Sequence, residues 1–448
     1  VTLSLKQLAT GPFQYEQKAP LGYLWEVKLL VMALGSSQQV LRLFSLLCGL
    51  VSLAVLVPVA RYFLRGWGVV AAVGILALSG PCIYHATEAK QYGAELLATL
   101  LALRLYIRYH ADPTPRGQLC WGLGGAVLLW FSFPLIFVLA GMAVALGTAA
   151  LRRGRQVQVY LLSFGLWLLS FGVQYLLFVG KYPQSGWLIA FFDYQYHAFP
   201  PASLAGGGWL AHKTYLLTQH PLGLLLRAPE VEFLHASAWR LVLKMGWLHL
   251  GCLLAGTALL LRANRLRGAI LVLPVLLTLL AAGLRIYPFH ERFTLFLAPM
   301  LVLLTAYGLE HGLRVLPGRL TPTLLTLLFF APTVYNSTAQ ALHPAQLMNR
   351  EYNREVIFYV NDRFRPGDVV YVFWNMRHAY GFYQAAYGLR YKAVQGSYVK
   401  NMASGPPDYL RRLQPDLAQL RGAKRVWFIY DYMNRDAIGD YVGQPAWY

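Results

Sequence analysis

Long apolar segments recur along the first three quarters of the chain, with short polar segments between them. A run of about 18 or more apolar residues is long enough to cross a bilayer as a helix. The pattern predicts ten spans, at about 38–60, 66–84, 89–109, 117–133, 134–150, 156–179, 239–262, 268–285, 292–313 and 320–337. The fourth and fifth are short and meet at "SFP", where Pro134 predicts a break. The chain is therefore predicted to be a polytopic α-helical membrane protein, with residues 38–337 as its membrane core.

After about residue 338 the apolar runs become shorter. The sequence "REVIFYVNDRFRPGDVVYVFW" (354–374) predicts a helix, a turn at "PGD" and a buried strand. Two helical segments and the strand-like "RVWFIYDY" (425–432) follow. Alternating helices and strands are typical of an α/β domain, so residues 338–448 are predicted to form a small soluble domain. It contains no phosphate-binding glycine loop and no nucleophile elbow, which favours a role in packing or acceptor docking.

The basic residues of the membrane core lie on alternate loops, and loops rich in Lys and Arg stay on the cytoplasmic side. These residues are Arg61 and Arg65; Arg104, Arg108 and Arg116; Arg152, Arg153 and Arg155; Arg262, Arg265 and Arg267; and Arg314 and Arg319. The segments predicted to face outward are 1–37, 84–89, 180–238, 285–291 and the chain after 338. Interfacial segments are expected within the outer loop 180–238, which has aromatic clusters, and an interfacial helix within the first outer loop, 1–37.

Composition narrows the function classes. The 448 residues are 57% hydrophobic and carry a formal net charge of +20, but the charge is divided among short loops, which argues against nucleic-acid binding. The four cysteines fall within or at the ends of apolar segments and fit buried small side chains better than disulfides or metal ligands. No His, Asp or Glu cluster has metal-ligand spacing, so no tightly bound metal and no other cofactor is expected.

Ionisable residues crowd into "YHATEAKQYGAEL" (84–96), at the predicted outer edge of the third span. Thr87 is expected to cap this helix and Glu88 to lie in its first turn, where an acid is ordinary. Lys90 would oppose the helix dipole there. Helical spacing puts Glu88, Gln91, Tyr92 and Glu95 on one face. Glu95, nearly two turns into the membrane, needs a partner or a wet cavity.

A second helix that starts at the outer face shows the same feature. In "YPFHERFTLFLAPM" (287–300) Arg292 begins the helix, and His290 and Arg285 come just before it. Two helix starts with extra cations predict a bound anion between them, and a phosphate fits best. The alternative is that these cations only reach out to lipid headgroups.

These two segments, together with "YEQKAPLGYL" (15–24) and "VLRLFSLLCGL" (40–50), resemble bacterial membrane glycosyltransferases of the family 39 type in order and spacing. That family belongs to the GT-C fold, with the protein mannosyltransferases and the lipid A aminoarabinose transferase. The resemblance extends over most of the chain. It implies hexosyl or pentosyl transfer from a polyprenyl-phosphate-linked sugar to a lipid, glycan or protein acceptor. The expected location is the outer face of a bacterial inner (plasma) membrane.

The resemblance and the charges together give a candidate site. The catalytic candidates are Glu88 and Glu16, the donor-phosphate candidates are Lys90, Arg292, Arg285, Tyr92 and His290, and the first-loop pocket candidates are Gln17, Lys18 and Pro20. In this family a carboxylate just after the first membrane helix acts as general base. The resemblance therefore implies a chain truncated at its N-terminus, with the main base upstream of Val1. Lys18, where many relatives have a small residue, and Glu95, where an Asp is frequent, depart from the family pattern.

In the mechanism that follows, the cations stabilise the negative charge that develops on the leaving lipid phosphate. A carboxylate removes the proton of the acceptor hydroxyl. Two alternatives remain from other classes. A lipid or solute transporter would show internal repeats and charges at mid-membrane, which the sequence lacks. A non-catalytic membrane scaffold would leave the cations at the outward helix starts unexplained.

Overall fold

The computed structural model describes most of the chain, in the stretches 3–10, 19–112, 114–152, 157–180, 186–201, 206–227, 243–318, 320–343 and 352–431. Glu16, Gln17 and Lys18 lie outside the described residues. The chain divides into two compact units. One contains residues 2–183 and 195–348, and the other contains Val1, 184–194 and 349–448.

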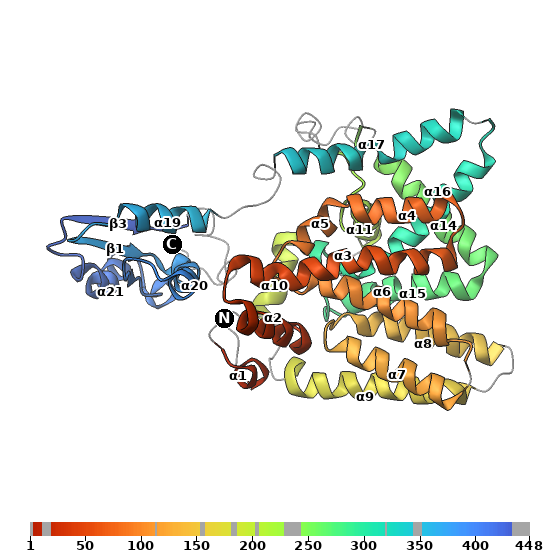
Figure 1. The fold of residues 1–448 in the computed structure, drawn as a ribbon, viewed down its shortest axis with the longest axis horizontal. Helices are drawn as coiled ribbons and strands as arrows, with labels where there is room; N and C mark the ends of the chain where they lie inside the picture. The colour runs from red at the N-terminus through yellow and green to blue at the C-terminus, as the bar shows by residue number, and fades with distance from the viewer. Residues whose placement is uncertain are drawn as a thin grey trace. The chain divides into compact units, whose positions relative to one another are not determined.

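The described elements up to residue 343 are helical (Figure 1). They are α1 (Leu5–Thr10), α2 (Leu21–Leu34), α3 (Gln38–Phe63), α4 (Trp67–Leu78), α5 (Gly80–Ala86), α6 (Tyr92–Tyr109), α7 (Pro115–Leu129), α8 (Leu135–Arg152), η2 (Val157–Tyr160), α9 (Leu161–Gln174), η3 (Tyr175–Val179), α10 (Gly186–Tyr196), α11 (Gly206–Gln219), α14 (Gly246–Ala263), α15 (Arg265–Gly283), η4 (Glu291–Leu297), α16 (Ala298–Val315) and α17 (Leu320–Leu342). Of these, η2 and η4 are 3₁₀ helices and η3 is a π-helix.

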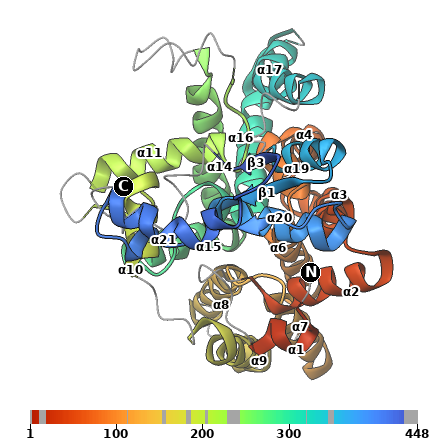
Figure 2. The ribbon, with the colours of Figure 1, turned by 90° about the vertical axis from the view of Figure 1, so that its left-hand side faces the viewer.

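The long helices of the first unit pack in pairs. α3 lies along α6, α7 along α9, α8 along α15, and α14 along α16. Figure 2 shows this bundle nearly end-on, with α7 and α9 at its lower edge. The segment Glu291–Val315 is the most enclosed of the membrane-length helices, because 94% of its apolar stretch is buried within the protein. This helix therefore forms the centre of the bundle.

Each of the ten predicted spans contains a helix, and the predicted break at Pro134 is present between α7 and α8. In the part of the chain that the structure describes, six helices are long and apolar enough to cross a membrane. The bent pair α4 and α5 makes a seventh if it is one span. These two helices meet at an angle of 55°, where Ser79 caps α5 and Pro81 follows. Other predicted spans correspond to less typical helices: α6 carries three charged residues, and α7 has 15 residues.

Two glycines allow α14 and α16 to approach closely at the centre of the bundle. A Cβ atom on Gly256 would lie 1.9 Å from the carbonyl oxygen of Leu304, and one on Gly308 would lie 1.9 Å from that of Cys252. Real atoms cannot approach so closely, so any side chain at either position would push the helices apart. Small residues at such contacts are typical of helix pairs inside membranes, because they let backbones pack directly.

The second unit contains a small parallel sheet of the order β2-β1-β3. Its strands are β1 (Asp368–Val372), β2 (Val394–Gln395) and β3 (Arg425–Ile429). The helices α19 (Asn353–Arg363), α20 (Arg377–Tyr387) and α21 (Pro406–Ala418) alternate with the strands, and η5 (Trp374–Met376) and η6 (Lys400–Met402) are short 3₁₀ helices. The predicted helix, "PGD" turn and strand are thus present as α19, the turn at Gly367 (φ 92°) and β1.

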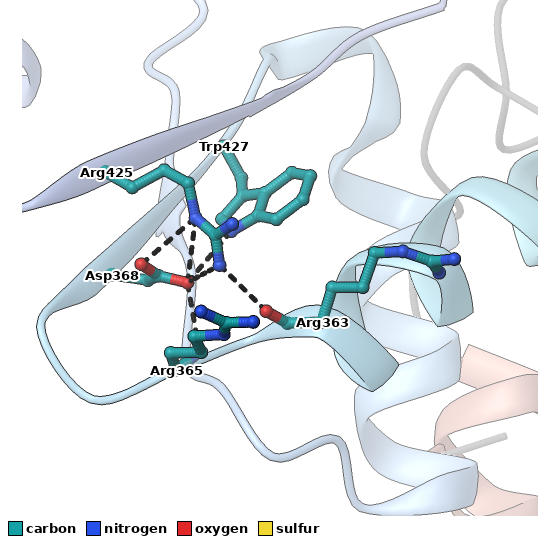
Figure 3. A network of polar contacts seen from close by, with 5 residues as sticks. All are labelled: Arg363, Arg365, Asp368, Arg425 and Trp427. Atoms are coloured by element: carbon teal, nitrogen blue, oxygen red, sulfur yellow. Dashed lines mark hydrogen bonds and ion pairs between the residues drawn. The ribbon is translucent and has the colours of Figure 1, made fainter.

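An ionic network joins the first residues of β1 and β3 in this unit (Figure 3). The guanidinium of Arg425 and the indole N–H of Trp427 both donate to Asp368, at 2.6 and 3.1 Å to its Oδ2. The backbone N–H of Arg365 donates to the same oxygen at 3.0 Å. The Arg425 guanidinium holds the pKa of Asp368 at about 2, so the network stays ionised at neutral pH. It fixes the parallel register of the two strands.

We predict that the α14–α16 contact tolerates no side chain. Gly256→Ala or Gly308→Ala should lower the stability of the folded bundle by about 1–3 kcal/mol, because the added methyl group overpacks the helix contact. Gly251→Ala and Gly312→Ala are matched controls on the same two helices, since a Cβ there would contact nothing within 4 Å. Thermal unfolding of the purified protein in detergent measures the difference. Equal melting temperatures for all four variants would contradict the close contact.

Candidate functional site

The charged segment of residues 87–91 is a turn between α5 and α6. α5 ends at Ala86 and α6 begins at Tyr92. The sequence predicted that Thr87 caps α6 and that Glu88 and Lys90 lie in its first turn, and this prediction was wrong. Thr87 instead closes α5, since its N–H and its hydroxyl both donate to the carbonyl oxygen of Tyr84 at 3.0 Å. Glu88 therefore lies outside the first turn of α6. A favourable interaction with the dipole of that helix does not explain why an acid is present here.

Glu88 is joined to two histidines in a polar chain. Its Oε2 lies 3.0 Å from Nδ1 of His85, and Nε2 of His85 lies 3.2 Å from Nε2 of His220. The side chain of His85 is 6% exposed and that of Glu88 is 24% exposed. This series of polar contacts thus begins at the partly accessible carboxylate of Glu88 and continues to His220 in the protein interior.

The protonation of the two rings is constrained by these contacts. Two ring nitrogens 3.2 Å apart form a hydrogen bond only if one carries a proton and the other does not. Burial lowers the pKa of His220 to about 3, so this ring is neutral at physiological pH. His85 can then donate from Nδ1 to Glu88 and accept at Nε2 from His220.

His220 is fixed against the start of α5. It follows directly after α11, and the hydroxyl of Ser79 donates to the carbonyl oxygen of Pro221 at 2.7 Å. Gly223 has φ 67°, and a Cβ there would lie 3.0 Å from the backbone of Ser79 and Gly80. The segment after α11 and the bend between α4 and α5 thus pack backbone to backbone. This contact brings the two histidines together although 135 residues separate them.

Lys90 and Arg292 form a pair of like charges next to Glu88. Lys90 lies in the turn outside the spanning helices, and Arg292 lies in the first turn of η4. Partial burial lowers the pKa of Lys90, Arg292 lowers it further, and Glu88 opposes both effects. Neither cation forms an ion pair with a described residue, although the guanidinium of Arg292 lies 5.3 Å from the ring of Phe293. Two neighbouring cations with no ion-pair partner among the described residues repel each other, and an anion bound between them would offset that repulsion.

Tyr92 and Glu95 continue this site along α6. The Tyr92 ring meets the ring of His85 edge-on at 5.0 Å and that of Phe293 at 6.5 Å, so it lies between the histidine chain and η4. Glu95 is 3% exposed, and its Oε2 has no hydrogen-bond partner among the described residues. Helical spacing predicted that Glu88, Gln91, Tyr92 and Glu95 share one face of a helix. This holds for Tyr92 and Glu95, which both belong to α6. A buried carboxyl group without a partner is costly and is usually kept for function.

A small cavity lies on the other side of His220. Its volume is about 30 Å³, and its lining includes Lys213, Gln219, His220, His290 and Glu291. The ammonium of Lys213 donates to the carbonyl oxygen of Tyr196 at 3.0 Å, and Glu291 lies 3.5 Å from His290. The Nδ1 atom of His220 has no partner among the described residues. A cavity of this size can hold about one water molecule, which could bond that nitrogen.

Two residues between the end of α15 and the start of η4 have positive φ angles: Arg285 in the loop (φ 56°) and Glu291, the first residue of η4 (φ 28°). Such non-glycine residues cost of order 1–3 kcal/mol each and cluster at functional sites. The Arg285 guanidinium lies 5.9 Å from the ring of Phe199. The ring of His290 stacks on that of Tyr196 at 4.5 Å.

Of the first-loop candidates, Pro20 is described, and Glu16, Gln17 and Lys18 are not. Pro20 is buried and is the residue before α2. The next turn of α2 brings Tyr23 to Cys48 of α3 and Ala94 of α6. Burial raises the pKa of Tyr23 to about 12, a hydrogen bond with Ser45 opposes this, and the charge of Glu88 adds to it. Tyr23 of α2 therefore packs against α3 and α6, close enough to Glu88 to be affected by its charge.

The sequence did not identify four residues of this site: His85, His220, Tyr23 and Ser45. His85 had a local signal, because it lies three residues before Glu88, a spacing that brings side chains together on a helix. Ser45 donates to the carbonyl oxygen of Lys90 at 2.8 Å from the middle of an apolar helix, where nothing in the pattern indicated it. Among the described residues, no group of three or more His, Cys, Asp and Glu side chains could hold a metal ion.

Comparisons with known proteins identify the fold. No family model matches the sequence, and no curated protein matches it. The structure is similar to the crystal structure of ArnT from Cupriavidus metallidurans in the apo state, with a TM-score of 0.52 and 13% identity, over 93% of this chain and 82% of ArnT. It also matches AglB from Archaeoglobus fulgidus, in complex with an inhibitory peptide and a dolichol-phosphate, with a TM-score of 0.48 and 12% identity, over 92% of this chain and 62% of AglB.

The ArnT match decides the fold class. The chain has a GT-C-like fold. This confirms the predicted class, a polytopic helical membrane protein with a small α/β unit. At 13% identity the likeness concerns the fold alone, so the resemblance to the family 39 type stays a prediction.

We predict a pH-dependent stability that originates at His220. The folded protein keeps this ring neutral down to about pH 3, whereas the unfolded chain takes up a proton below about pH 6.5. Its contribution to stability is therefore complete above about pH 6.5 and is lost as the pH falls toward 3, by at most about 1.4 kcal/mol per pH unit.

Thermal unfolding between about pH 7 and pH 5 tests this prediction. The melting temperature of His220→Gln should fall less steeply with acidification than that of the parent. The exposed His343, changed to Gln, is the matched control and should keep the parent's slope. A His220→Gln variant with the parent's slope would show that this ring is protonated in the folded protein.

Proposed function

We propose that this protein is a glycosyltransferase of the family 39 type that transfers a sugar from a polyprenyl-phosphate-linked donor to an acceptor. The donor phosphate binds between Lys90 and Arg292, and Glu88 lines the adjoining acceptor side. The reaction takes place at the outer face of a bacterial plasma membrane, the side opposite to the five loops that carry the clustered arginines. The second unit lies on the same side and docks the acceptor.

One observation carries this proposal: the cations Lys90 and Arg292 lie together, partly buried, with no carboxylate partner among the described residues. Cations that merely reach lipid headgroups would extend into solvent, and burial would not lower the pKa of Lys90 as it does here. A phosphate between them would neutralise both and accept hydrogen bonds from both. The fold supports the same conclusion, because ArnT, an aminoarabinose transferase, shares it.

The chemistry follows from the charges. When the bond between the sugar and the phosphate breaks, negative charge grows on the phosphate oxygens, where Lys90 and Arg292 stabilise it. The acceptor hydroxyl loses its proton as it attacks the sugar carbon. The Oε2 atom of Glu88 is engaged by His85, which leaves Oε1 to accept a hydrogen bond from the acceptor. His85 and His220 hold this carboxylate in position as it takes up the proton.

We predict that Lys90→Gln and Arg292→Gln each reduce transfer while the protein stays folded. Each loses a charge-assisted contact to the phosphate, worth about 1.5–3 kcal/mol, so transfer should fall by at least about tenfold. Glu88→Gln keeps the size of the side chain and should also reduce transfer by about tenfold or more. Arg42→Gln, an exposed arginine near the start of α3, is the matched control and should transfer at the parent rate.

The measurement is transfer of radiolabelled sugar from polyprenyl-phosphate-linked mannose and from polyprenyl-phosphate-linked aminoarabinose to membrane acceptors. Melting temperatures of all variants show whether they fold. Parent-level transfer by Lys90→Gln, Arg292→Gln and Glu88→Gln would leave headgroup contact as the only role of these cations. A parent that transfers from neither donor would contradict the proposed donor class.

A further inference from the structure

A larger cavity lies at the opposite end of the bundle from Glu88. Its volume is about 250 Å³, and it opens between the ends of α3, α14, α15 and α16. Ser45 of α3 contacts Lys90, and Phe63 at the other end of α3 lines this cavity. Eighteen residues of helix separate them, a rise of about 27 Å. The cavity is therefore separate from the site that contains Glu88, and nothing in the proposed transfer reaction uses it.

The cavity is strongly basic. Arg65, Arg267 and Arg314 line it from three different segments, and the carboxylate of Glu310 is the acid among its lining residues. Glu310 is 5% exposed, and its two oxygens are engaged by the side chain of Arg314 and by the backbone N–H of Arg65 at 3.1 Å. A Cβ on Gly68 would lie 2.2 Å from this carboxylate. The absence of a side chain at Gly68 therefore leaves room for Glu310.

Two guanidinium groups remain available after this neutralisation. The side chain of Arg65 makes no hydrogen bond or ion pair with a described residue. The guanidinium of Arg267 lies 4.2 Å from the centre of the Tyr62 ring, which orients it without neutralising it. His311 also lines the cavity, but its Nδ1–H donates to the carbonyl oxygen of Tyr307 at 2.9 Å, so Nε2 of the neutral ring is an acceptor and adds no donor for an anion.

The position of Arg267 argues for an anion as well. Arginines in the last turns of α3, α14 and α16 complement the negative ends of those helices, which is ordinary. Arg267 instead lies in the first turn of α15, whose positive end attracts anions and which has no acidic residue in that turn. A cation there opposes the helix dipole unless an anion is bound to both.

We propose that this cavity binds the phosphate group of an anionic phospholipid headgroup from the surrounding bilayer. Guanidinium groups bind phosphate oxygens with two parallel hydrogen bonds, and basic pockets between membrane helices are suited to anionic headgroups. The volume equals that of roughly eight water molecules, enough for a phosphate with a short glycerol group. The site does not depend on the proposed function.

Lipid binding to the purified, delipidated protein tests the proposal. The probes are dihexanoyl phosphatidylglycerol, its zwitterionic counterpart dihexanoyl phosphatidylcholine and inorganic phosphate, each titrated by calorimetry below the lipid's micelle concentration. The parent should bind phosphatidylglycerol at least about tenfold more tightly than phosphatidylcholine, and this preference should weaken with added salt. The double variant Arg65→Gln with Arg267→Gln should lose the preference.

A double variant of Arg116→Gln with Arg152→Gln is the matched control. It removes the same charge from exposed positions on the same predicted side that do not line the cavity, and it should keep the preference. Arg65→Gln alone tests the site without disturbing the contact with Tyr62. Equal losses in the two double variants, or equal binding of the two lipids by the parent, would overturn the proposal. Inorganic phosphate that binds the parent as tightly as phosphatidylglycerol would show a site for free phosphate and overturn the lipid assignment.

Discussion

Lys90 and Arg292 repel each other at the edge of an apolar bundle, where water screens charge less than it does in bulk. The fold holds them there all the same. Lys90 is held by a turn whose backbone is bonded to Ser45 of α3, and Arg292 by a 3₁₀ helix that continues into the most enclosed helix of the bundle. Because both backbones are fixed, the two cations start from neighbouring positions, and an anion is the simplest source of compensation.

The rest of the site is organised around this constraint. Tyr92 fills the space between the histidine chain and η4 with its ring, and Glu88 is held by His85 rather than paired with Lys90. If Glu88 formed a full ion pair with Lys90, Arg292 alone would be left to bind a phosphate, and the affinity would be lower. The histidines therefore keep the carboxylate close to the cations without letting it neutralise them. A similar arrangement is present at the other end of the bundle. There Arg314 forms an ion pair with Glu310, and Arg65 and Arg267 remain free to bind an anion.

Much of the fold could be predicted from the sequence, because each helix that crosses a membrane requires a long continuous run of apolar residues. The ten spans, the break at Pro134 and the helix, turn and strand around Gly367 all follow from local patterns. The 55° bend at Ser79 and the start of α6 at Tyr92 were missed, since an apolar run looks the same whether its helix is straight or broken. The charge pattern at two helix starts predicted that Lys90 and Arg292 flank one bound anion. The proximity of His85 and His220 was missed, because it depends on a tertiary contact between segments 135 residues apart, which no local pattern reports.

The most direct test of this account is an experimental structure of the protein with a short-chain polyprenyl phosphate. The account predicts phosphate density between the side chains of Lys90 and Arg292, with Glu88 on the adjoining side and its Oε2 still bonded to His85. Phosphate density confined to the arginine cavity at the opposite end, or no density beside Lys90 at saturating ligand, would contradict it.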